Sequence, residues 1–135
     1  MFLDVNSFQT NQNRFITISD GSSNNYVYFR YIDSSNQIWF RIASNGIAGS
    51  FQIYNYTNPE TFIKTAIRYS NNSFDIFLNG VKILTSTGVN TLSNSINQLR
   101  FSSFDGSNLF QGNVNSLQLY KTALTDQECI NLTTI

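Results

Sequence analysis

The chain of 135 residues contains no histidine, one cysteine and one proline, and only 12% of its residues are charged. Without histidine, the usual general base, the Ser-His triad and the commonest zinc ligand are missing, which disfavours protease, lipase and deaminase chemistry. One cysteine allows no disulfide within the chain. Cys129 stands among apolar residues of a C-terminal segment with helical spacing, so we expect a buried, inert thiol. Acid–base catalysis here would have to rely on carboxylates.

The charges that are present do not form runs. Eight basic and eight acidic residues give a formal net charge of zero, which provides no electrostatic footprint for nucleic acid or an anionic membrane. No apolar run approaches the length of a membrane span, so we expect neither a nucleic-acid partner nor membrane insertion. Asn, Ser and Thr make up about a third of the chain, which predicts a polar but largely uncharged surface.

Short segments with period-two alternation and β-branched or aromatic residues run through the whole chain. Asn79-Gly80 joins two of them and favours a type I′ hairpin turn. Asp-Gly turns begin at Asp20 and Asp105. This pattern predicts an all-β fold, a two-sheet antiparallel β-sandwich forming one domain over residues 1–135. The expected strands are residues 14–19, 26–31, 37–43, 51–56, 62–70, 74–78, 81–85, 98–103 and 113–120.

The last strand leads into a segment with helical signals. Thr125 and Glu128 are three residues apart, the spacing of a capping box in which each side chain bonds the other residue's backbone N–H. Leu124 and Ile130 can pack across the start of this turn. The sequence therefore predicts a short C-terminal helical turn.

Three motifs carry a resemblance to a known family. They are TAIRY at residues 65–69, FDIFLNG at residues 74–80, and FQGNVNSLQLYKTALTDQE at residues 110–128. Together they resemble the closing half of a concanavalin A-like, laminin-G-like jelly roll. The segment FITISDGSSNN at residues 15–25, followed by a tyrosine-rich strand, is similar to the form of this module in bacteriophage tail-fibre and other virion proteins. The resemblance implies a virion or other extracellular surface as the location.

The resemblance also implies one or two further strands before Phe2. We therefore expect the chain to be part of a larger protein that lacks an N-terminal strand here, with Met1 as an artificial boundary. A symmetric trimer fits a tail-fibre setting, but the sequence does not require one.

Two neighbouring strands are expected to place aromatic and basic side chains on one exposed face. Along the strands expected at residues 26–31 and 37–43, every second side chain points into the core. A hairpin would make the two strands neighbours and bring their outward-facing side chains together. This patch suits either a sugar ring or a protein interface, while the alternative is that Trp39 packs under a loop or against the missing N-terminal strand. We expected Phe77 near the same patch. The candidate ligand-binding residues are Tyr26, Tyr28, Arg30, Trp39 and Arg41.

Calcium is a second expectation carried by the resemblance, because laminin-G-like modules often hold this ion at the sandwich rim. Asp20, Asp33 and Asp105 are the candidate ligands, since carboxylates with neighbouring amide oxygens suit calcium. The competing interpretation is that each aspartate forms a turn by accepting hydrogen bonds from its own backbone.

Three functions follow. The first is a non-catalytic, lectin-like carbohydrate-binding module that recognises a glycan. The second is a structural or decoration domain that docks on another virion subunit. The third is a fragment of a polysaccharide-degrading enzyme, which is disfavoured because the chain lacks the alternating carboxylates of jelly-roll glycoside hydrolases.

Overall fold

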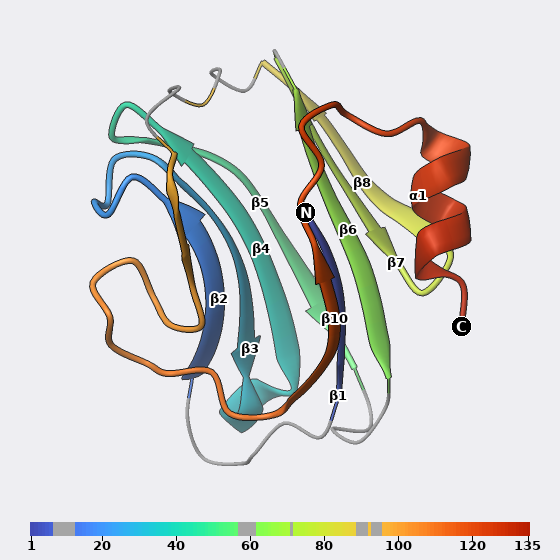
Figure 1. Cartoon of the computed structure of the whole chain (residues 1–135), viewed down its shortest axis with the longest axis horizontal. Coiled ribbons are helices and arrows are strands. Elements are labelled where there is room, and N and C mark those ends of the chain that lie inside the picture. Colours follow the sequence, from blue (N-terminus) through green and yellow to red (C-terminus); the bar gives the residue numbers. More distant parts are fainter. Residues whose placement is uncertain (7–12, 57–61, 71, 89–91, 93–95) are drawn as a thin grey trace. The chain divides into compact units, whose positions relative to one another are not determined.

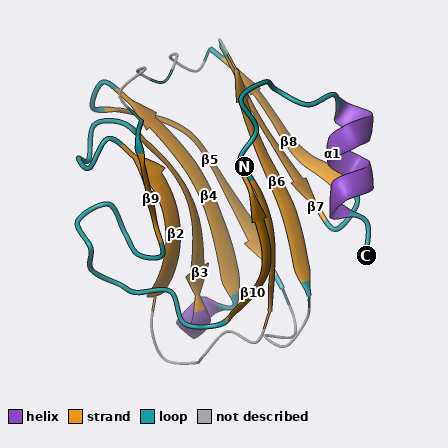
Figure 2. Ribbon diagram, viewed as in Figure 1, coloured by secondary structure: helices purple, strands orange, loops and turns teal. Residues whose placement is uncertain are grey.

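The computed structural model describes residues 1–6, 13–56, 62–70, 72–88, 92 and 96–135. Within these residues, ten strands, one 3-10 turn and one helix follow each other in sequence (Figures 1 and 2). They are β1 (Phe2–Asn6), β2 (Asn13–Ser19), β3 (Tyr26–Ile32), η1 (Asp33–Ser35), β4 (Gln37–Ser44), β5 (Ile47–Asn55), β6 (Ile63–Ser70), β7 (Ser73–Leu78), β8 (Val81–Thr87), β9 (Gln98–Arg100), β10 (Asn113–Gln118) and α1 (Asp126–Thr133).

The strands form two five-stranded sheets, each in its own compact unit. Sheet A has the order β10-β1-β6-β7-β8, and the unit around it includes α1. Sheet B has the order β5-β4-β3-β2-β9. All described pairings are antiparallel. The predicted fold class, an antiparallel two-sheet sandwich of the concanavalin A-like jelly-roll type with a short C-terminal helix, is confirmed.

Every predicted strand is present, although some extents differ. Strand β5 begins at Ile47, earlier than expected, whereas β9 ends at Arg100 and β10 ends at Gln118, earlier than expected. Strand β1 was not predicted. It lies between β10 and β6, and its alternation is short: Leu3 and Val5 are fully buried, whereas Asp4 and Asn6 between and after them are half-buried.

The predicted hairpin turn joins β7 and β8. Asn79 and Gly80 have φ values of 47° and 79°, the left-handed conformation that a type I′ turn requires at both positions. Asn79 Oδ1 also accepts a hydrogen bond from the backbone N of Lys64 at 2.9 Å. A Cβ added to Gly80 would lie 3.2 Å from Thr134 Oγ1, so the turn also packs closely against the C-terminal end of α1.

The predicted capping box opens α1. The backbone N of Thr125 donates to Glu128 Oε2 at 2.7 Å, and the backbone N of Glu128 donates to Thr125 Oγ1 at 3.3 Å. Cys129 is buried as expected, and burial raises the pKa of its thiol. The expectation for Phe77 is wrong: this side chain lies in sheet A and is buried against Ala66 and Cys129 beneath α1. Its neighbours Ile76 and Leu78 are buried as expected.

Side chains alternate along β3 and β4 as the sequence predicts. One face of sheet B carries fully or almost fully buried residues from both strands: Val27, Phe29, Tyr31, Ile38, Phe40 and Ile42. The opposite face carries the predicted binding residues. Within the described part of the chain, α1 is too short and too polar to cross a membrane.

Candidate functional site

Four of the five predicted binding residues line one cleft on sheet B, with a volume of about 340 Å³. They are Tyr26, Tyr28, Arg30 and Arg41, which come from β3 and β4. We call this hollow the sheet-B cleft. Its other lining residues come from β2 and from the segment after β9: Asn13, Phe15, Ser103, Phe104, Asp105, Ser107 and Asn108.

Strand register brings the predicted residues together. Tyr28 stands opposite Arg41 across the β3–β4 pair, and Arg30 stands opposite Trp39. Because directly opposed residues on one sheet face have Cβ atoms about 5 Å apart, these side chains form two adjacent rows. The hairpin expected between the two strands, with its connection at η1, is therefore confirmed.

Stacked aromatic rings form the floor of the cleft. The Tyr26 and Tyr28 rings stack with centroids 5.4 Å apart, and Phe104 stacks on Tyr26 at 5.7 Å. Phe15 meets Tyr28 edge-on at 5.2 Å. The two tyrosines are only 7% and 5% exposed, so the predicted open patch is wrong in this respect. Phe15 from β2 and Phe104 from the segment after β9 cover them, and neither was assigned to the site from sequence.

Trp39 lies beside the cleft and is not among its described lining residues. The guanidinium carbon of Arg30 covers its ring at 4.7 Å from the centroid, and also lies 5.0 Å from the centroid of Phe15. The indole Nε1 of Trp39 donates to Gln37 Oε1 at 3.0 Å. Trp39 therefore acts on the cleft through Arg30, which it holds in place, rather than as an open platform.

Arg30 and Arg41 bring two cations to the cleft without a partner of opposite charge. In the described residues, neither guanidinium makes an ion pair or a hydrogen bond, and the Nε atom of each is buried without an acceptor. Burial raises the pKa of the neighbouring Tyr26, and the charge of Arg41 opposes this shift. The cleft therefore combines an apolar floor with two unneutralised positive charges.

The wall of the cleft is a turn built around Asp105. Asp105 Oδ1 accepts hydrogen bonds from the Ser103 hydroxyl, from the Ser107 backbone N at 2.9 Å and from the Ser107 hydroxyl at 2.7 Å. These donors, Ser103 first, lower the pKa of Asp105 to about 2. Because the side chain of Ser103 bonds into this turn, β9 cannot continue to residue 103 as predicted.

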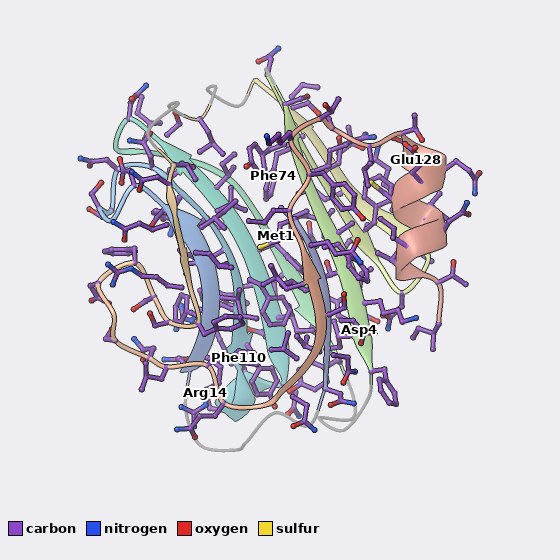
Figure 3. The ribbon with its side chains drawn as sticks, viewed as in Figure 1. Met1, Asp4, Arg14, Phe74, Phe110 and Glu128 are labelled. Carbon is purple, nitrogen blue, oxygen red and sulfur yellow. The ribbon has the colours of Figure 1, made fainter. Side chains whose placement is uncertain are left out.

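Arg14 ties this wall segment to β2. Its Nη1 donates to the Leu109 carbonyl at 3.3 Å and its Nη2 donates to Gln111 Oε1 at 2.9 Å. These two acceptors follow Arg14 by 95 and 97 positions in the sequence. Figure 3 labels Arg14 beside the foot of the long loop that follows β9, and Phe110 further along the same loop. Arg14 is 3% exposed, so its role is to position the loop.

The structure gives each calcium candidate a different setting. Asp20 accepts hydrogen bonds from Ser22 and Asn25, which lower its pKa, as in a self-contained turn. Asp105 forms the turn described above. The side chain of Asp33 lies outside the described part of the chain. Among the described residues, no three acidic, cysteine or histidine side chains cluster as metal ligands. Calcium binding stays a prediction.

A model of the concanavalin A-like lectin/glucanases superfamily matches residues 1–129. The chain belongs to this superfamily. No curated protein sequence matches this superfamily member.

Solved structures share the fold. The CBM40 module of the Ruminococcus gnavus IT-sialidase is similar with a TM-score of 0.77 at 13% identity, covering 98% of this chain and 80% of that one. The same module bound to alpha2,3 sialyllactose gives a TM-score of 0.77 at 15% identity, with the same coverage. The leech intramolecular trans-sialidase gives 0.75 at 17% identity, and the match covers 99% of this chain but only 23% of that enzyme. At these identities the likeness concerns the fold.

Proposed function

We propose that the chain is a non-catalytic carbohydrate-binding module whose ligand occupies the sheet-B cleft. The observation that carries this proposal is the aromatic floor, in which the half-buried Phe104 packs on a layer of the more buried Tyr26, Tyr28 and Phe15, bordered by arginine and asparagine side chains. A volume of about 340 Å³ falls at the lower end of the roughly 300–1,000 Å³ typical of small-ligand pockets, which suits one or two sugar rings.

The chemistry of the cleft matches that of a sugar. The C–H faces of a pyranose ring are apolar and pack on aromatic side chains, whereas its hydroxyl groups need donors and acceptors around the rim. Asn13 and Asn108 supply both, and the guanidinium groups of Arg30 and Arg41 supply donors. Asp105 is the one carboxylate among the described lining residues, whereas a glycosidase uses a pair.

The fold neighbours support this class of ligand. The CBM40 module of the Ruminococcus gnavus IT-sialidase has been solved with alpha2,3 and with alpha2,6 sialyllactose. The resemblance of residues 15–25 to virion modules supports a phage virion or another extracellular surface as the setting. There the module would attach its carrier to a glycan-bearing host surface.

A glycan-array screen of the purified chain tests the proposal, run once with calcium and once with a chelator. Asn13→Trp should block the cleft and abolish binding, because the larger side chain would fill space beside Phe15. Val81→Trp is the matched control, since Val81 is 59% exposed on the edge strand of sheet A. Thermal unfolding confirms that both variants fold. Binding that survives Asn13→Trp would place the site elsewhere, and a blank array would reject the function.

The second candidate function is a structural domain that docks on another virion subunit. It is favoured by three exposed apolar side chains on or next to β9: Leu99 at 39%, Phe101 at 45% and Leu109 at 60% exposed. Exposed apolar clusters of this kind mark interaction surfaces. This function predicts concentration-dependent association in sedimentation experiments that Leu109→Ser weakens, whereas the carbohydrate-binding function does not require association.

A further inference from the structure

We infer that the sheet-B cleft selects an acidic sugar, with Arg41 and Arg30 together binding the carboxylate or sulfate group of the ligand. This inference rests on the proposed carbohydrate-binding function and specifies the class of sugar. It comes from the two arginine side chains of the cleft, whose donors have no acceptor among the described residues.

Arg41 has an N–H donor that lacks an acceptor among the described residues. Its side chain is partly buried, and its Nε–H is removed from water without a hydrogen-bond partner. A buried donor without an acceptor costs free energy, more so when it is charged. Burial raises the pKa of the neighbouring Tyr26 phenol, so this side chain stays neutral and does not balance the charge of Arg41. An anionic ligand would supply the missing acceptor.

Arg30 contacts two aromatic rings. Its guanidinium group lies against the rings of Phe15 and Trp39, at 5.0 Å and 4.7 Å from their centroids. Contact with two rings fixes the side chain and removes water from the faces of the guanidinium group. Its N–H bonds point along its edges and can still donate to an acceptor in the guanidinium plane. In a partly dry site, a cation attracts an anion more strongly than it does in bulk water.

The two guanidinium groups lie on the same side of the sheet. Arg41 is opposite Tyr28, which is two residues before Arg30 on β3, so the two arginines are diagonal neighbours. Diagonal positions are about 7–8 Å apart at the backbone, which is within the combined reach of two arginine side chains. Because both side chains line the same cleft, their guanidinium forks can bind one planar carboxylate or one tetrahedral sulfate between them.

The charge balance of the lining favours an anion. Arg30 and Arg41 face a single described carboxylate, Asp105, and three donors from Ser103 and Ser107 already surround its Oδ1. The chain as a whole has a formal net charge of zero, so this excess of positive charge is local to the cleft. A neutral sugar would leave both cations unpaired after excluding their water, which selects against it.

Three probes on one disaccharide test the inference by calorimetry: lactose, 3′-sialyllactose and 3′-sulfolactose. In parallel, the Nε–Hε signals of Arg30 and Arg41 are followed by NMR during additions of glucuronate or methyl glucoside. We expect the acidic member of each pair to shift both arginine signals and to bind about tenfold or more tightly, the gain typical of charge-assisted hydrogen bonds. Preference for the sialylated or the sulfated probe distinguishes a carboxylate from a sulfate.

Variants separate charge from geometry. Arg41→Gln should reduce affinity for the acidic probes about tenfold and affinity for a neutral sugar much less, because glutamine still donates a hydrogen bond but carries no charge. Arg41→Lys should recover only part of the loss for the acidic probes, because lysine keeps the charge but loses the fork. Lys121→Gln makes the same change in net charge at an exposed position in the other unit and should have no effect. Thermal unfolding verifies that each variant is folded.

The outcomes separate failure of the acidic-sugar inference from failure of the carbohydrate-binding function. Suppose that neutral glycans bind as tightly as their acidic counterparts, and that Arg41→Gln binds the acidic glycans as tightly as the unmodified chain does. The acidic-sugar inference is then overturned, while the carbohydrate-binding function stands. If no glycan of either kind binds and the arginine signals do not move, both fail. Acid-selective binding that Arg41→Gln removes supports both.

Discussion

Arg30 and Trp39 face each other across the β3–β4 pair, and the guanidinium carbon of Arg30 lies 4.7 Å from the centre of the Trp39 ring. The arginine lines the sheet-B cleft, whereas the tryptophan is next to Arg30 and outside the lining residues that the structure describes. The single tryptophan of the chain therefore positions a cationic side chain that lines the cleft.

Trp39→Ala should weaken glycan binding through Arg30. Loss of the ring removes a cation–π contact of about 0.5–2 kcal/mol and frees the arginine side chain, so we expect affinity to fall roughly 2- to 30-fold. Calorimetry measures this change. Trp39→Phe is the control, because it keeps a ring and should retain most of the affinity. Equal affinity in the alanine variant and the unmodified chain would show that Arg30 does not depend on Trp39.

Asp75→Asn should destabilise the unit that contains α1. Asp75 is 2% exposed and bonds Arg68 at 2.7 Å, while Lys82 lies 3.1 Å from its other oxygen; both cations also contact Asp126 at the start of α1. Removing the charge of Asp75 takes the buried partner away from Arg68 and Lys82. We therefore expect a loss of about 2–4 kcal/mol in the free energy of unfolding, measured with urea. Asp126→Asn should cost less, because that side chain is exposed. Equal effects of the two variants would contradict a network centred on Asp75.

Acid should destabilise the chain in a defined direction. Burial acts to raise the pKa of Asp75, but its bonds to Arg68 and Lys82 outweigh this and lower the pKa; that of Asp105 is lowered to about 2 by Ser103 and Ser107. The unfolded chain, with aspartate pKa values near 3.9, therefore binds protons first as pH falls. These contributions are present above about pH 4 and are lost progressively toward pH 2. Urea titrations across this window should show falling stability, with a shallower fall for Asp105→Asn. A constant free energy of unfolding would refute the assignment.

Thr125→Ala should loosen the start of α1. The variant removes the side-chain acceptor of the capping box and should lower the free energy of unfolding by about 1 kcal/mol. Thr125→Ser keeps the hydroxyl and should behave like the unmodified chain. If alanine and serine variants unfold together, the box makes no net contribution to stability.

Local signals in the sequence were sufficient for much of the fold. Alternation located the strands of both sheets, Asn79-Gly80 marked the hairpin, and Thr125 with Glu128 marked the helix start. Strand β1 was missed because its alternation covers only Leu3-Asp4-Val5-Asn6, which is too short a run to give a strong periodic signal. These features depend on neighbours in sequence or on side-chain periodicity.

The site was predicted only in part, because its cover comes from distant segments. Alternation on β3 and β4 identified Tyr28 and Arg41 correctly as members of one face. It gave no indication that Phe15 and Phe104 pack over the tyrosines, since Phe104 lies some 80 residues away in a segment whose course depends on Arg14. The Asp105-Gly106 turn was recognised as a turn, but its place in the wall of the cleft is a tertiary property.

Chemical-shift mapping with the tightest-binding glycan from the array tests the central claim most directly. Backbone amide signals are recorded as the glycan is added to the labelled chain. The account predicts that the largest shifts cluster around Tyr28 on β3, Arg41 on β4 and Asn108 in the wall segment, while α1 and the strands of sheet A remain unchanged. Shifts confined to sheet A or α1, or no shift with any glycan, would contradict a carbohydrate site in the sheet-B cleft.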